Sequence, residues 1–148
     1  MLKIKINNRP IEIEKGTTIF KAAEKLNISI PTFGGPENDI CFCEIEGKEE
    51  LVKATEIIEE DGMVIWTESP AVKQARIGVL TEIMKTHPQD CMNCGKLGEC
   101  KLQKYCQMYD VQSPEVLDEY KHIEKDMSSY FYMREADKCI RCGACIEV

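Results

Sequence analysis

The chain has 148 residues, of which 43% are hydrophobic and 30% charged, so it has enough apolar side chains for one ordinary domain or two small ones. Its net charge of −7 argues against a nucleic-acid partner, because phosphates require a basic face. No apolar run approaches the ~18 residues of a membrane helix. The first eight residues alternate charged and apolar side chains and hold no signal-peptide core. We therefore expect a cytoplasmic protein without a membrane span.

Residues 1–68 have the pattern of a small α+β domain. Apolar residues alternate with charged ones at residues 2–6 and 11–13, which predicts a hairpin with residues 7–10 as its turn. Thr17 and Thr18 can cap a helix over residues 19–26, because the apolar side chains there follow helical spacing. Three further short strands are expected, at residues 41–45, 51–53 and 63–66. A hairpin, a crossing helix and further strands form the order of a β-grasp domain.

The pattern becomes helical after Ser69. A helix is predicted from Pro70 to Thr86, capped by Ser69 and ended by His87-Pro88. A second helix is predicted over residues 99–109, with Leu102, Cys106 and Tyr109 on one face and Cys106 as a buried structural cysteine. A shorter one is predicted from Ser113 to about Tyr120, and His122 is expected at the surface. These segments give two further expected domains, residues 69–112 and 113–148.

The nine cysteines are unevenly placed. Seven of them follow residue 90, and six of those seven form two tight clusters. Clustered cysteines in a cytosolic chain favour metal binding over disulfides, which would join distant parts of the fold. The sequence therefore predicts a metal protein.

The stronger cluster combines one histidine with three cysteines. His87, Cys91, Cys94 and Cys100 have the spacing H-x3-C-x2-C-x5-C, and helices are predicted on both sides of this loop. Zinc accepts three cysteines and one histidine in a tetrahedron. Iron–sulfur clusters usually bind thiolates, with histidine as a minority ligand. The spacing alone leaves both alternatives open.

The second cluster is Cys139-Ile-Arg-Cys142-Gly-Ala-Cys145. It matches the start of the bacterial ferredoxin run C-x2-C-x2-C-x3-C-P, which binds 4Fe–4S clusters. The fourth cysteine of that run would stand at position 149, one residue after Val148. We therefore expect the chain to be a piece of a longer polypeptide, with a second 4Fe–4S cluster possible at these three ligands.

The whole arrangement resembles the N-terminal iron–sulfur region of the complex I large subunit, iron-only hydrogenases and NAD-linked formate dehydrogenases. The histidine and three cysteines match that family's 4Fe–4S module in spacing, which favours a cluster over zinc. Four other segments resemble family landmarks: Ile30–Thr32, Glu44–Gly47, Glu60–Met63 and Ser69–Val72. The resemblance implies a plant-type ferredoxin domain, a helical histidine-ligated 4Fe–4S module and the start of a bacterial-type ferredoxin domain.

The first domain departs from the family pattern. Aligning the landmarks puts Gly34, Asn38, Cys41 and Thr55 at the four positions where the family has 2Fe–2S ligands. Only Cys41 is a cysteine there, and Cys43 adds one more thiol on an expected strand. We expect a β-grasp fold that has lost its 2Fe–2S cluster. The alternative is a different register, in which Cys41 and Cys43 join ligands from elsewhere.

Clusters without a substrate site indicate an electron relay inside a larger oxidoreductase. No Ser-His-Asp set, paired acid–base carboxylates or Rossmann fingerprint is present. The expected partners are redox subunits or domains of the flavin/NAD, hydrogenase or formate dehydrogenase type. Two alternatives are a structural docking module for redox subunits and a zinc-binding interaction module.

Overall fold

The computed structural model describes residues 1–58, 60–115 and 124–146. The chain divides into two compact units. The first comprises residues 1–32 and 40–76, and the second comprises residues 33–39 and 77–148. Most of the predicted helix after Ser113, and His122 with it, lie outside the described residues.

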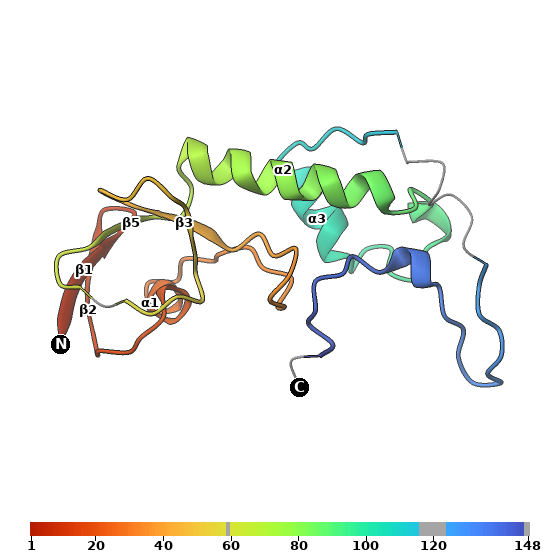
Figure 1. The fold of residues 1–148 in the computed structure, drawn as a ribbon, viewed down its shortest axis with the longest axis horizontal. Coiled ribbons are helices and arrows are strands. Elements are labelled where there is room, and N and C mark those ends of the chain that lie inside the picture. Colours follow the sequence, from red (N-terminus) through yellow and green to blue (C-terminus); the bar gives the residue numbers. More distant parts are fainter. Residues whose placement is uncertain (59, 116–123, 147–148) are drawn as a thin grey trace. The chain divides into compact units, whose positions relative to one another are not determined.

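The first unit is built on one mixed sheet (Figure 1). The strand order is β2-β1-β5-β3-β4; β1 and β5 are parallel, and the other neighbours are antiparallel. The strands are β1 Leu2–Ile6, β2 Arg9–Ile13, β3 Phe42–Ile45, β4 Val52–Lys53 and β5 Val64–Trp66. All five expected strands are therefore present, with bounds that differ by a residue or two.

The N-terminal hairpin has a tighter turn than predicted. Asn7 and Asn8 form it alone, with φ of 48° and 66°, values that asparagine tolerates better than most residues. Arg9 and Pro10 belong to β2 rather than to the turn. Pro10 is accommodated because β2 is an edge strand, where a missing N–H breaks no ladder on its outer side.

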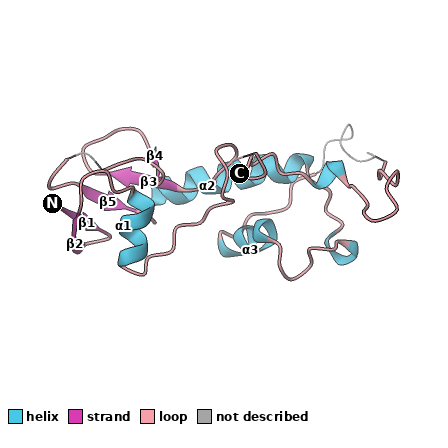
Figure 2. Ribbon diagram, turned by 90° about the horizontal axis from the view of Figure 1, so that it is seen from below, coloured by secondary structure: helices cyan, strands magenta, loops and turns pink. Residues whose placement is uncertain are grey.

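The predicted first helix is α1, Ile19–Lys25, with Thr18 as its cap. The hydroxyl of Thr18 accepts a hydrogen bond from the N–H of Lys21 at 3.3 Å. Figure 2 shows α1 alongside the strands, and its buried residues Ala22 and Ala23 join an isoleucine-rich core. Small residues on this face allow the short helix to approach the sheet closely.

Helix α2, Pro70–Thr86, matches the predicted range, and the hydroxyl of Ser69 caps it by accepting the Val72 N–H at 3.3 Å. One residue on the buried face of α2, Arg76, is charged. Arg76 is fully buried and donates to the carbonyls of Ile40 and Phe42, at 2.9 Å each. It also pairs with Glu68. The guanidinium thus fixes the backbone on both sides of Cys41.

Among its described residues, the second unit contains the later part of α2 and three short elements. They are the 3₁₀ helix Cys91–Asn93, α3 Lys101–Met108 and the 3₁₀ helix Ala136–Lys138. Helix α3 buries Leu102 and Tyr105, whereas the predicted face paired Leu102 with Cys106 and Tyr109. Within the described part of the chain, no helix combines the length and the apolar character that crossing a membrane would require.

Candidate metal centre

All four residues of the histidine–cysteine motif line one small cavity of the second unit. His87 directly follows α2, Cys91 begins a 3₁₀ helix, Cys94 follows it, and Cys100 is the N-cap of α3. Among residues 1–58, 60–115 and 124–146, no three His, Cys, Asp or Glu side chains are close enough to surround a single metal ion. The motif thus gathers its donors at one cavity without a preformed single-ion cage.

His87 is held in a defined orientation. Its Nδ1 lies 2.9 Å from the carbonyl oxygen of Pro88, and a carbonyl oxygen can only accept a hydrogen bond. Nδ1 therefore carries the proton, and in the neutral ring Nε2 keeps its lone pair. A backbone acceptor that fixes the tautomer in this way is typical of metal-binding histidines. The sequence motif did not indicate this role of Pro88.

Two of the cysteine sulfurs receive backbone N–H groups. Cys94 Sγ accepts from the N–H of Lys96, and Cys100 Sγ accepts from the N–H of Gln103, both at 3.5 Å. Cys100 also stands at the N-terminus of α3, where exposed N–H groups favour negative charge. These donors suit thiolates, which are the metal-binding form of cysteine.

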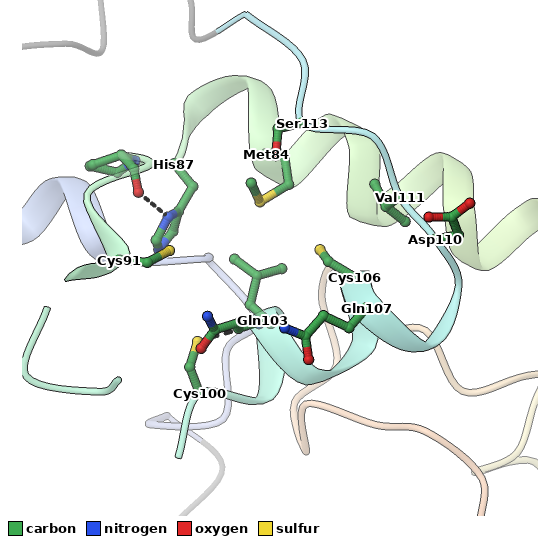
Figure 3. A pocket seen from close by; sticks show the side chains of 12 residues that line it. Met84, His87, Cys91, Cys100, Gln103, Cys106, Gln107, Asp110, Val111 and Ser113 are labelled. Carbon is green, nitrogen blue, oxygen red and sulfur yellow. Dashed lines mark hydrogen bonds between the residues drawn. The ribbon is translucent and has the colours of Figure 1, made fainter. Parts of the chain in front are cut away.

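A neighbouring cavity of about 300 Å³ contains a further thiol, Cys106 (Figure 3). His87, Cys91 and Cys100 line the same cavity. The side chain of Cys106 is half-buried, so it is not the fully enclosed structural cysteine that the sequence predicted. Burial raises the pKa of its thiol, and the nearby Cys100 and Cys91 add to that rise.

The second cysteine cluster lies on one loop of the same unit. Cys139 and Cys145 are exposed and Cys142 is half-buried. The backbone N–H of Arg141 donates to Cys139 Sγ at 3.4 Å. The loop turns sharply, with φ of 53° at Arg141 and 80° at Gly143. The sulfur of Cys139 thus accepts one backbone N–H on a sharply turned loop.

Lys138 lies next to both cysteine sets. It directly precedes Cys139 and lines the small cavity that His87, Cys94 and Cys100 also line. Its Nζ donates to Glu135 at 2.9 Å, and this hydrogen bond raises the pKa of Lys138. The motif analysis had not identified this lysine, which lines the cavity together with Lys96 and Asp90.

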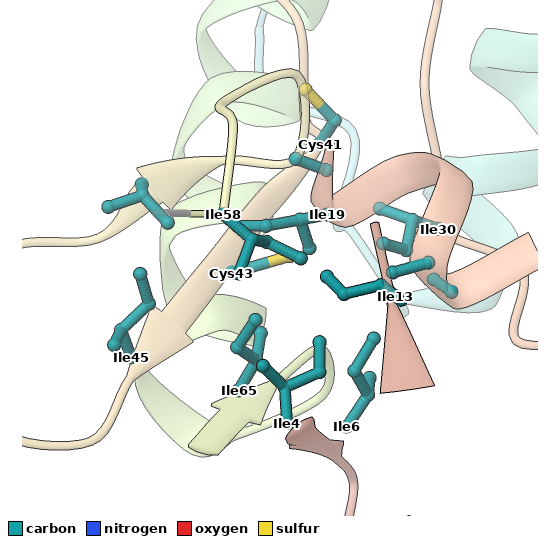
Figure 4. Close-up of a cluster of buried hydrophobic side chains, with 14 of the residues drawn as sticks. Ile4, Ile6, Ile13, Ile19, Ile30, Cys41, Cys43, Ile45, Ile58 and Ile65 are labelled. Carbon is teal, nitrogen blue, oxygen red and sulfur yellow. The ribbon is translucent and has the colours of Figure 1, made fainter. Parts of the chain in front are cut away.

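The two cysteines of the first unit have a different environment. Cys41 is 2% exposed and Cys43 is fully buried among core isoleucines (Figure 4). Burial raises the pKa of Cys43 to about 12. The thiolate form, which is the form that binds metals, is therefore harder to reach at Cys43 than at a solvent-exposed cysteine.

Two family models match the chain. Residues 76–115 match the NADH-ubiquinone oxidoreductase-G iron–sulfur binding region, a range that contains the four residues of the histidine–cysteine motif. Residues 1–70 match a 2Fe–2S iron–sulfur cluster binding domain. Fold, donor set and matches together define the class of the protein as iron–sulfur binding.

The similar proteins include members of two kinds of complex. One component of the NADH-quinone oxidoreductase of Rhizobium meliloti (strain 1021) is 32% identical over 100% of this chain and 18% of its own length. The NADP-reducing hydrogenase component HndD of Solidesulfovibrio fructosivorans is 34% identical over 98% of this chain and 27% of its own length. The chain therefore spans about a quarter or less of these curated relatives.

A solved structure has the same fold. The crystal structure of NAD+-reducing [NiFe]-hydrogenase in the H2-reduced state matches 98% of this chain and 64% of that chain, with a TM-score of 0.81 and 20% identity. Over nearly its whole length the chain is thus similar to parts of an NADH-quinone oxidoreductase and of an NADP-reducing hydrogenase, and both family models that match it describe iron–sulfur binding regions.

Proposed function

We propose that this chain relays electrons inside a larger oxidoreductase, through a 4Fe–4S cluster bound by His87, Cys91, Cys94 and Cys100. The observation that carries the proposal is that these four donors line one cavity within the matched iron–sulfur region. A bound 4Fe–4S cluster supplies reversible one-electron transfer. No substrate chemistry is assigned to the chain itself.

Backbone groups around this cavity support the proposed ligands. The carbonyl of Pro88 keeps His87 Nε2 free to act as a ligand. The N–H groups of Lys96 and Gln103 stabilise negative charge on the Cys94 and Cys100 sulfurs. A neutral imidazole in place of a thiolate makes the centre one charge less negative, which raises its reduction potential.

We assign a second, incomplete ligand set to Cys139, Cys142 and Cys145. The position of Lys138 supports an exchange of electrons between the two sets, because the residue next to Cys139 lines the first cavity. The fourth ligand of this second centre would come from outside the described residues. In this assignment residues 69–112 form the histidine-ligated module and residues 113–148 contain the start of a ferredoxin-type domain.

The first domain, residues 1–68, is proposed to be a plant-type, β-grasp ferredoxin domain that has lost its cluster. The strand order and the match to a 2Fe–2S domain support the fold. The burial of Cys41 and Cys43, and the raised pKa of Cys43, support the loss. Gly34, Asn38 and Thr55 offer no thiolate at the other three aligned ligand positions.

The proposed partners are other redox subunits or domains of the same complex. The relatives named NADH-quinone oxidoreductase and NADP-reducing hydrogenase support partners that handle nicotinamide cofactors or hydrogen. Formate dehydrogenase-type partners remain part of the same proposal. We place the complex in the cytoplasm.

The test is iron, sulfide and zinc content, with EPR of the dithionite-reduced protein purified without oxygen. About four irons per chain and a 4Fe–4S signal that His87→Ala alters would support the proposal. About eight irons would add a cluster at the second ligand set. A 2Fe–2S signal would contradict the loss of the first cluster. Stoichiometric zinc without iron would contradict the relay and favour an interaction module.

A further inference from the structure

Within the second unit, the loop of residues 33–39 lies directly against the cysteine loop of residues 139–145. The backbone N–H of Glu37 donates to the carbonyl of Cys142 at 3.1 Å. The side-chain amide of Asn38 donates to the carbonyl of Ile140, also at 3.1 Å. Two donors of one loop thus fix two carbonyls of the other, across about a hundred residues of sequence.

The packing between these loops is too close for side chains at two glycines. A Cβ built on Gly35 would lie 2.0 Å from the carbonyl oxygen of Cys142 and 2.4 Å from the backbone N of Ala144. A Cβ on Gly143 would lie 2.9 Å from Pro36 Cδ, and Gly143 has a φ of 80°. Glycine at both positions therefore permits the two backbones to meet.

The loop of residues 33–39 is itself anchored at its base. The N–H of Phe33 donates to the buried carboxylate of Asp39 at 3.1 Å, which closes the loop. The ring of Phe33 packs edge-on against Tyr105 of α3, with ring centroids 5.5 Å apart. Because Cys100 caps α3, the same loop contacts the element that presents one cysteine and the loop that presents three others.

Asn38 acts on a particular sulfur through one peptide group. The carbonyl of Ile140 and the N–H of Arg141 belong to the same planar peptide unit, so fixing the carbonyl also fixes the N–H. That N–H donates to Cys139 Sγ. Hydrogen bonds in such a chain polarise one another, and N–H donors to sulfur raise the potential of an iron–sulfur centre.

We propose that the loop of residues 33–39, which aligns with the cluster-binding loop of plant-type ferredoxins, is a scaffold for the cysteine loop of residues 139–145. Asn38 is its main positioning residue, and it orients the Arg141 N–H toward Cys139 Sγ. Gly35 provides the close backbone contact. The effect on a bound centre rests on the proposed function, whereas the docking of the two loops does not.

The test uses hydrogen–deuterium exchange of the whole chain in its iron-free form. Gly35→Ala forces the loops apart, and Asn38→Gly removes the side-chain donor while glycine tolerates the φ of 46° at this position. Gly78→Ala is the matched control, because a Cβ there meets nothing within 4 Å. We expect exchange in peptides covering residues 139–146 to be about tenfold faster in Gly35→Ala and about threefold faster in Asn38→Gly.

The control should exchange like the wild type, and peptides of residues 1–32 should be unchanged in all three variants. Wild-type exchange at residues 139–146 in both loop variants would overturn the scaffold. A second readout applies to the iron-loaded protein if a second centre is present. Asn38→Gly should then shift the EPR signal and lower the potential of that centre, and leave the His87 centre unchanged. If the two loop variants exchange faster but the anaerobically purified wild type contains no iron, the scaffold stands and the proposed function alone is overturned.

Discussion

The two units contain cysteines in opposite environments. Cys41 and Cys43 in the first unit are buried in an isoleucine core, whereas the cysteines of the two motifs in the second unit are half-buried or exposed. Burial holds the pKa of Cys43 at about 12, while Cys94, Cys100 and Cys139 each accept a backbone N–H. The difference shows that the surroundings of a thiol, and not the spacing of cysteines alone, set how easily it takes the thiolate form that binds metals.

The largest expected effect comes from exchanging one thiol in each unit for a methyl group. Cys94→Ala should lose the roughly four irons of the histidine-ligated centre, because a 4Fe–4S cluster lacking one ligand is open to solvent and decays. Cys43→Ala should keep the full iron content. Iron and sulfide analysis of anaerobically purified protein measures both. Equal iron loss in the two variants would remove the contrast between the units.

The next effect concerns Arg76, which fixes the backbone around Cys41. Arg76→Met should lower the free energy of unfolding by about 2–4 kcal/mol, because it removes the buried guanidinium that donates to the carbonyls of Ile40 and Phe42 and pairs with Glu68. Denaturant unfolding followed by circular dichroism measures the change. Arg9→Met is the control: Arg9 is exposed, so we expect a change within about 0.5 kcal/mol. A loss of similar size in both variants would contradict the role of Arg76.

Alkylation of the iron-free folded protein should separate the two kinds of thiol directly. Cys139 and Cys145 are exposed, so they should react with iodoacetamide about a hundredfold faster than Cys43 or more. Mass spectrometry of digested samples taken over time gives the rate at each residue. The difference should disappear in denaturant. Rapid labelling of Cys43 in folded protein would show that the first unit exposes a thiol for metal binding.

The effect that is smallest near neutral pH is a pH dependence of stability from Cys43, because it develops only above pH 9. Its pKa is raised from 9.0 in the unfolded chain to about 12 in the fold. The unfolded state therefore releases the proton first, and the stabilisation is complete below pH 9 and declines from pH 9 to about 12. Relative to Cys43→Ala, the wild type should lose about 1.4 kcal/mol per pH unit in this range. If the free energies of unfolding of the wild type and Cys43→Ala depend on pH in the same way, Cys43 is not buried as a neutral thiol.

Local patterns predicted much of the fold because their causes are local. The alternation in β1 and β2, the Thr18 cap and the Ser69-Pro70 start of α2 each depend on residues a few positions apart. The turn at Asn7-Asn8 was predicted too long because proline is usually a turn residue. The sequence does not reveal that β2 is an edge strand, where Pro10 costs no hydrogen bond.

The ligand motifs were also visible in the sequence, because ligand spacing is a local property. The structure brings His87, Cys91, Cys94 and Cys100 to one cavity, and their role as ligands stays a prediction. Three features could not be predicted: the buried charge of Arg76, the presence of Lys138 at the cavity, and the contact between Asn38 and Ile140. Each depends on partners that are distant in sequence, and only tertiary packing brings them together.

The central claim is that the second unit transfers electrons through a histidine-ligated cluster and the first unit has none. The most direct measurement is a potentiometric titration of the anaerobically purified protein, followed by EPR, for the wild type and His87→Cys. We predict a reversible 4Fe–4S signal whose potential falls in His87→Cys, because a thiolate adds one negative charge, and no 2Fe–2S signal in either protein. Three results would contradict the account: a 2Fe–2S signal, a reduction potential that is the same in the wild type and His87→Cys, or a protein that contains zinc and shows no redox activity.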